Sequence, residues 1–96
     1  MICVDDCSPD NSIAIVEEYA KKHDNLVIVR NQYNRKLGGA RNAGMDVAKG
    51  EYIWFIDSDD FIEENCLKTL LTIAEKEDLE MLHFNYAASA FLFIQV

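Results

Sequence analysis

The sequence predicts an α/β fold in which a mainly parallel sheet of about four strands carries helices on both faces. Short apolar runs rich in β-branched residues alternate with amphipathic stretches of helical period, which is the pattern of parallel sheets. Two of the apolar runs also end alike. Asp5 and Asp6 follow the first run, and Asp57, Asp59 and Asp60 follow a later one.

The first half of the chain reads as strand, helix, strand and helix. Apolar composition predicts buried strands, helical spacing of apolar residues predicts amphipathic helices, and glycines mark one helix start. We expect a strand over 2–4, a helix over 12–22, a strand over 26–29 and an Ala-rich helix opening at Gly38 and Gly39 and running to 48. These elements form two successive strand and helix repeats of a parallel sheet.

The second half continues this pattern and then changes character. We expect a strand over 52–56, an amphipathic helix over 63–76 with acids in its first turn, and a strand over 81–84. Residues 87–96 are apolar and uncharged, and they are too few to cross a bilayer as a helix. The sequence therefore predicts one domain over 1–86, followed by an apolar tail over 87–96.

Composition limits the classes of partner and compartment. The chain has 96 residues and a net charge of −8, which argues against non-specific nucleic-acid binding and against docking on anionic membranes. Its three cysteines are odd in number and lack the spacing of a zinc site, which indicates a reducing compartment such as the cytoplasm.

The two acidic groups are expected to converge. The carboxyl ends of parallel strands meet at one edge of a sheet, which is where ligands bind in such folds. Like charges at one site raise one another's pKa unless a cation compensates them. Considered alone, the acids after 52–56 favour a solvated loop, but the pair Asp5 and Asp6 favours a site for a hard divalent ion.

A glycine-rich segment over 37–44 suggests a place for phosphate. Glycines allow close approach of a ligand to the backbone, and the amino end of a helix offers free amides and a positive dipole. Arg41 would add a full positive charge on the first turn. Considered alone, the glycine pair predicts only a tight loop before the helix. The acidic groups expected nearby favour the interpretation of this segment as a phosphate site.

Three motifs in this order resemble the nucleotide-binding half of family 2 glycosyltransferases. They are VDDCSPDNS at 4–12, GARNAG at 39–44 and KGEYIWFIDSDD at 49–60, and the resemblance covers about residues 2–86. It implies a partial GT-A, Rossmann-like domain and a nucleotide-diphosphate sugar donor, with a UDP-sugar as the first candidate. It also implies a magnesium or manganese ion at an Asp-x-Asp motif.

The resemblance also implies roles for individual residues. Asp6, with Asp5 beside it, would contact the nucleotide base, and Arg41 would lie near the base or diphosphate. Asp57 would face the ribose or the metal, and Asp59 would ligate the metal, whereas Asp60 is a weaker candidate. The substrate-binding set is thus Asp5, Asp6, Arg41, Asp57 and Ser58, and the metal ligands are Asp57 and Asp59.

The sequence departs from the family pattern at both ends. Members usually begin with one more strand, and their catalytic carboxylate lies beyond the last residue of this chain. The resemblance therefore implies a glycosyltransferase fragment of polysaccharide biosynthesis that binds its donor but cannot transfer alone. The acceptor would be a glycan or a lipid-linked glycan, in the cytoplasm, with the inner face of the membrane as a further option for the full-length enzyme.

Two alternatives stay open at this point. A phosphoacceptor receiver domain also has an acidic pair after its first strand and an aspartate after its third, but it leaves the segment 39–44 and the two adjacent acids after Asp57 unexplained. The other alternative is a non-catalytic remnant that forms homo-oligomers through its open sheet edge.

Overall fold

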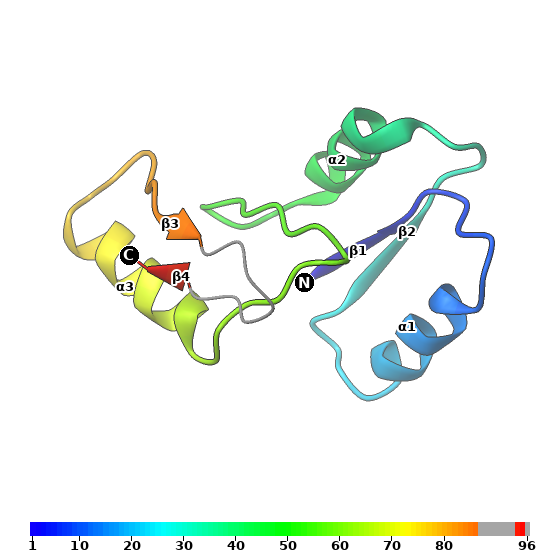
Figure 1. Cartoon of the computed structure of the whole chain (residues 1–96), viewed down its shortest axis with the longest axis horizontal. Coiled ribbons are helices and arrows are strands. Elements are labelled where there is room, and N and C mark those ends of the chain that lie inside the picture. The colour runs from blue at the N-terminus through cyan, green and yellow to red at the C-terminus, as the bar shows by residue number, and fades with distance from the viewer. Residues whose placement is uncertain (87–93, 96) are drawn as a thin grey trace. The chain divides into compact units, whose positions relative to one another are not determined.

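The computed structural model describes residues 1–86 and 94–95, and the chain divides into two compact units, Met1–Phe55 and Ile56–Val96 (Figure 1). The first unit contains β1 (Ile2–Asp5), α1 (Ser12–Ala20), β2 (Val27–Arg30) and α2 (Lys36–Val47). The second contains α3 (Cys66–Lys76), β3 (Asn85–Tyr86) and β4 (Ile94–Gln95). No helix of the described residues is both long and apolar enough to cross a membrane.

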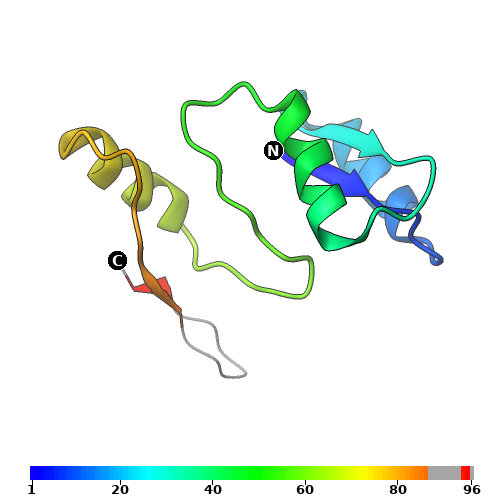
Figure 2. The same ribbon diagram turned by 90° about the horizontal axis from the view of Figure 1, so that it is seen from above.

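The first unit is a parallel strand pair between two helices. β1 and β2 pair in parallel, with Ile2 opposite Val27 and Asp5 opposite Arg30. α2 packs against β1 and α1 against β2, and the two helices lie on opposite faces of the pair (Figures 1 and 2). The predicted α/β class with helices on both faces is therefore confirmed.

Local sequence explains how α1 begins and how it docks. The Asp10 carboxylate accepts hydrogen bonds from the Ser12 hydroxyl and from the Ser12 main-chain amide, the latter at 3.0 Å, at the start of the helix. Half-buried Ile13, Val16 and Ala20 recur at helical spacing and give α1 its apolar face. At the end of β2, Arg30 forms an ion pair with Glu17 of α1.

The predicted count of about four strands is wrong for the described residues. The parallel sheet has two strands, and β3 and β4 form a separate antiparallel pair. Residues 52–56 belong to neither sheet, although Tyr52 and Trp54 are half-buried while Ile53 and Phe55 are exposed, as the alternating pattern suggests. Such a pattern predicts an extended chain, but pairing also needs a neighbouring strand in register, which the pattern does not encode.

The second unit is built on α3. Cys66, Leu70 and Ala74 are buried along one stripe of this helix. The helix begins at Cys66 instead of residue 63, because Asn65 just before it has a left-handed backbone with φ of 62°. The predicted strand over 81–84 is also wrong, since the strand pairing starts at Asn85. Of the apolar tail over 87–96, only 94–95 fall within the described residues.

Candidate functional site

The carboxylate of Asp6 is held directly beyond the carboxyl end of β1. Its Oδ1 atom accepts hydrogen bonds from the Asn31 side-chain amide at 2.7 Å and from the Arg35 main-chain amide at 2.8 Å. The Arg35 amide, followed by the Asn31 amide, lowers the pKa of Asp6 below its ordinary value of 3.8, because both bonds favour the charged form. Asp6 is therefore a half-buried anion with a fixed orientation.

The Asp5 side chain binds the loop that follows β1. Its Oδ1 atom accepts a hydrogen bond from the Ser8 main-chain amide at 2.9 Å. The Ser8 hydroxyl and amide lower the pKa of Asp5, and the positive charge of Arg30 acts in the same direction, whereas the charge of Asp6 opposes it. The two neighbouring acids thus differ in their partners, and Asp5 shapes the loop that carries Asp6.

The amino end of α2 lies at the same edge of the sheet as Asp6. The helix begins at Lys36, one residue after the amide that binds Asp6, and the Lys36 amide donates to Asn34 Oδ1 at 2.9 Å. The prediction that this helix opens at Gly38 and Gly39 is therefore wrong by two residues. Gly39 has a packing role, because a Cβ there would lie 2.5 Å from the Cβ of Arg35.

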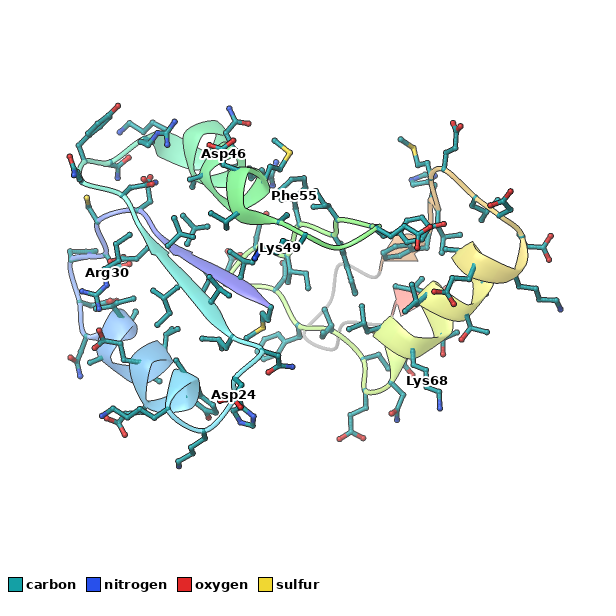
Figure 3. The ribbon with its side chains drawn as sticks, turned by 180° about the vertical axis from the view of Figure 1, so that it is seen from behind. Asp24, Arg30, Asp46, Lys49, Phe55 and Lys68 are labelled. Atoms are coloured by element: carbon teal, nitrogen blue, oxygen red, sulfur yellow. The ribbon has the colours of Figure 1, made fainter. Side chains whose placement is uncertain are left out.

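Arg41 lies in the second turn of α2 and not in the first, as a consequence of the earlier helix start. Its guanidinium carbon is 5.6 Å from the centroid of the Phe55 ring, in a cation–π arrangement. Phe55 lies beside α2 (Figure 3). Arg41 is half-buried, and its predicted role at the base or diphosphate stays a prediction.

The Asp-x-Asp segment forms an exposed turn in the second unit. The Asp60 amide donates to the Asp57 carbonyl at 3.0 Å around a turn made by Ser58 and Asp59, and all four residues are exposed. In the described residues no three carboxylate, thiol or imidazole side chains form a cluster that could hold a metal. Hard oxygen donors do suit magnesium and manganese. Because the two acidic groups belong to different units, their convergence stays a prediction.

The sequence reading missed Asn31 and Arg35 as partners of Asp6. In the observed register Asp5 lies opposite Arg30, so the next residues, Asp6 and Asn31, face each other beyond the paired strands. Asn31 follows the second apolar run after one intervening residue, Arg30, and only the strand register identifies it as a partner of Asp6. Arg35 binds through its main chain, so its residue type carried no such signal.

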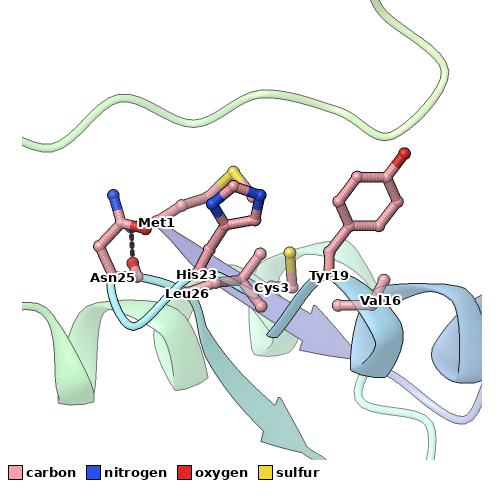
Figure 4. Close-up of a pocket in the computed structure, with 7 residues that line it drawn as sticks. All are labelled: Met1, Cys3, Val16, Tyr19, His23, Asn25 and Leu26. Carbon is pink, nitrogen blue, oxygen red and sulfur yellow. Dashed lines mark hydrogen bonds between the residues drawn. The ribbon is translucent and has the colours of Figure 1, made fainter. Parts of the chain in front are cut away.

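A hollow of about 440 Å³ lies at the opposite, amino end of β1 (Figure 4). Its lining residues come from β1 and the residue before it, from α1 and from the segment between α1 and β2, and they are Met1, Cys3, Val16, Tyr19, His23, Asn25 and Leu26. The rings of Tyr19 and His23 stack with centroids 6.4 Å apart. Since Met1 precedes β1 and Asp6 follows it, this apolar hollow is separate from the Asp6 loop.

Comparison with known proteins assigns this arrangement to a family. The sequence model of glycosyl transferase family 2 matches residues 1–89. EpsH of Bacillus subtilis, named as a glycosyltransferase, is 48% identical over 89 residues, which are 92% of this chain and 25% of EpsH. Glycosyltransferase GlyG of Streptococcus pneumoniae serotype 4 is 43% identical over 89 residues, or 90% of this chain and 29% of GlyG.

A third relative has a more specific name. The poly(ribitol-phosphate) beta-glucosyltransferase of Bacillus spizizenii is 47% identical over 68 residues, which are 70% of this chain and 11% of that protein. The chain therefore belongs to glycosyl transferase family 2, whose domain is of the GT-A, Rossmann-like class. Membership of this family excludes the alternative of a phosphoacceptor receiver domain. The chain spans between 11% and 29% of the length of these three relatives.

Proposed function

We propose that this chain supplies the donor-binding part of a glycosyltransferase and binds a nucleotide-diphosphate sugar, with a UDP-sugar as the first candidate. The observation that carries the proposal is the Asp6 carboxylate, fixed by two hydrogen bonds at the sheet edge where α2 begins. A fixed carboxylate can accept a hydrogen bond from a ring N–H of the base, with Asp5 shaping the loop beside it. The neighbouring helix end and Arg41 suit the negative diphosphate.

A divalent cation completes the proposed donor site. Asp57 and Asp59 would hold magnesium or manganese through carboxylate oxygens, and Ser58 between them would contact the donor. Such an ion stabilises the negative charge that develops on the leaving nucleoside diphosphate. The protein contributes the base contact at Asp6 and the orientation of the donor.

The acceptor and the setting are proposed from the relatives. One relative is named for a glucosyl transfer connected with poly(ribitol-phosphate), and another as a minor teichoic acid biosynthesis protein. We propose a glycan or lipid-linked glycan as the acceptor of the complete enzyme, in polysaccharide biosynthesis. The proposed location is the cytoplasm, at the inner face of the membrane where the acceptor is lipid-linked.

Titration calorimetry tests the donor site. We expect UDP to bind the 96-residue chain with manganese present and to bind much more weakly without it. Asp6→Asn and Asp59→Asn should each weaken binding by about tenfold or more, since each removes a charged interaction with the ligand or the metal. Asp78→Asn is the matched control, because this exposed acid belongs to neither group. Equal affinities for all four proteins would contradict the proposal.

Transfer of the sugar requires more than binding of the donor. Inverting transfer needs a base that deprotonates the acceptor hydroxyl, and we assign no residue of 1–86 to that role. We therefore expect donor binding without transfer when a UDP-sugar, manganese and a panel of glycan acceptors are supplied. Formation of a glycosylated product would overturn this part of the proposal.

Self-association is the second candidate function. The parallel sheet of the described residues has two strands, and these residues expose large apolar side chains, among them Val27 at the edge strand β2 with 48% exposure. Open edges of this kind pair readily with another chain. Sedimentation velocity over a range of concentrations should give a rising mass if copies pair, and a constant monomer mass would remove this candidate.

A further inference from the structure

Asn31, the residue directly after β2, forms hydrogen bonds with three successive residues at and after the end of β1. Its main-chain amide donates to the Asp5 carbonyl at 2.9 Å, and its side-chain amide donates to Asp6 Oδ1 at 2.7 Å. Its carbonyl accepts a weak hydrogen bond from the Cys7 thiol, with 3.4 Å between sulfur and oxygen. The main-chain amide, the side-chain amide and the carbonyl of Asn31 thus bind three successive residues, Asp5, Asp6 and Cys7.

The side-chain bond determines how the Asp6 carboxylate is turned. The hydrogen bonds from the Asn31 side-chain amide and from the Arg35 main-chain amide reach the same oxygen of this carboxylate, Oδ1. Rotation about the Cβ–Cγ bond of an aspartate is otherwise broad. Two donors on one oxygen fix this rotation and give the other oxygen a defined direction.

We propose that Asn31 is a positioning residue for the donor nucleotide: its side-chain amide holds the Asp6 carboxylate in the orientation that accepts a hydrogen bond from the base. The inference rests on the proposed function, because it assumes that Asp6 contacts the nucleotide. It adds the residue directly after β2 to a site otherwise formed by the loop after β1 and by α2. Preorganisation of this kind raises affinity because the orientation is set before the ligand binds.

Several groups besides Asn31 influence the pKa of Asp6. Besides Asn31, the main-chain amides of Arg35 and Lys36 lower the pKa of Asp6, and the charge of Arg35 lowers it more weakly. Asp5 is the neighbouring acid, and Arg30 lies opposite it across the strand pair. The substitution of Asn31 by alanine adds no charge and removes none of these groups, so a change in the pKa of Asp6 in N31A reports the lost amide bond.

The first experiment needs no ligand. The carboxyl carbon of Asp6 is followed by NMR against pH in the 96-residue chain and in N31A, N31D and N25A. N31A should raise the pKa of Asp6, and N31D should raise it further, because it replaces the donor by a like charge of nearly the same shape. N25A is the matched control, since Asn25 binds Met1 through a main-chain carbonyl that the substitution keeps.

The second experiment measures UDP affinity with manganese for the same four proteins. We expect a loss of about tenfold in N31A and at least as much in N31D, as for a hydrogen bond to a charged group, and a change below about twofold in N25A. Wild-type affinity in N31A and N31D would overturn the role of Asn31 and leave the donor site standing. Absence of UDP binding by the unaltered chain would overturn both proposals. If N31A does not fold, the UDP affinity of N31D tests the role of Asn31.

Discussion

At the scale of single residues, the loop after β1 combines fixed carboxylates with one unfavourable backbone conformation. Cys7 has φ of 66°, in the left-handed region that residues with a Cβ atom rarely adopt. Its neighbours Asp6 and Ser8 take part in the hydrogen bonds that hold the loop in place. The conformation of Cys7 is thus imposed by the contacts of the residues around it.

Replacing Cys7 by glycine should therefore stabilise the chain. Relief of the left-handed conformation contributes about 1–2 kcal/mol. The greater freedom of glycine in the unfolded state and the loss of the weak thiol hydrogen bond to Asn31 remove part of that gain, which leaves a net increase of less than about 1 kcal/mol. Urea denaturation followed by circular dichroism measures the free energy of unfolding. Gln32→Gly, in a neighbouring loop without a positive φ, should lower stability slightly. A loss of stability in Cys7→Gly would show that the backbone there is not strained.

The carboxylates of this loop should make the fold sensitive to acid. Hydrogen bonds lower the pKa of Asp5, Asp6 and Asp10 from 3.8 in the folded chain. The folded state then binds fewer protons than the unfolded state, so their stabilisation is present above about pH 3.8 and is lost as the pH falls through the lowered values. Urea denaturation at pH 6 and pH 3 should show this loss. Asp6→Asn should lose less than the unaltered chain, and an equal loss would contradict the assignment.

At the scale of elements, the close approach of α2 to β1 places the helix start beside Asp6. A Cβ atom on Gly44 would lie 3.3 Å from Val4 Cγ2, which is tighter than ordinary contact. A Cβ atom on Gly38 of the same helix would meet nothing within 4 Å. Gly44 thus serves packing between helix and strand, whereas Gly38 is sterically free.

These two glycines give opposite predictions. Gly44→Val should destabilise the chain by about 1–3 kcal/mol, because the added methyl groups must push α2 away from Val4. Gly38→Ala should stabilise it by roughly 0.5–1 kcal/mol, because alanine favours the helix and meets no obstacle. Both changes are measured as free energies of unfolding in urea. Equal effects of the two substitutions would contradict the observed packing of α2 on β1.

The elements that could be predicted from sequence are those whose signal is local. The apolar runs before Asp5 and Arg30 and the helical spacing of Ile13, Val16 and Ala20 predicted the first strand, helix and strand. The start of α2 was missed by two residues, because glycines in the first turn look like a loop. The pairing of 52–56 was wrongly predicted, since it depends on a partner strand that periodicity does not specify.

The site was predictable to a similar extent. Asp5 and Asp6 stood out as charges directly after an apolar run, but their different partners depend on how the loop turns. Asn31 became visible only through the strand register, which pairs Asp5 with Arg30. The amide of Arg35 that binds Asp6 belongs to the main chain. Every residue except proline carries such an amide, so the residue type does not indicate this contact.

At the scale of the whole molecule, the proposed function depends on the prediction that the two acidic groups bind the same donor. Asp6 belongs to Met1–Phe55, and Asp57 and Asp59 belong to Ile56–Val96. A nucleotide diphosphate with its metal would bind at both groups, through the base at one and the cation at the other. The family model matches residues 1–89, a range that includes both groups.

Paramagnetic broadening by manganese in NMR spectra of the isotope-labelled chain tests this joint site most directly. With UDP and manganese together, we predict that amide signals of residues 57–60 and of residues 5–8 broaden in parallel, and that Asp59→Asn abolishes both effects. Broadening confined to residues 57–60, and unchanged by UDP, would contradict a donor site shared by the two acidic groups.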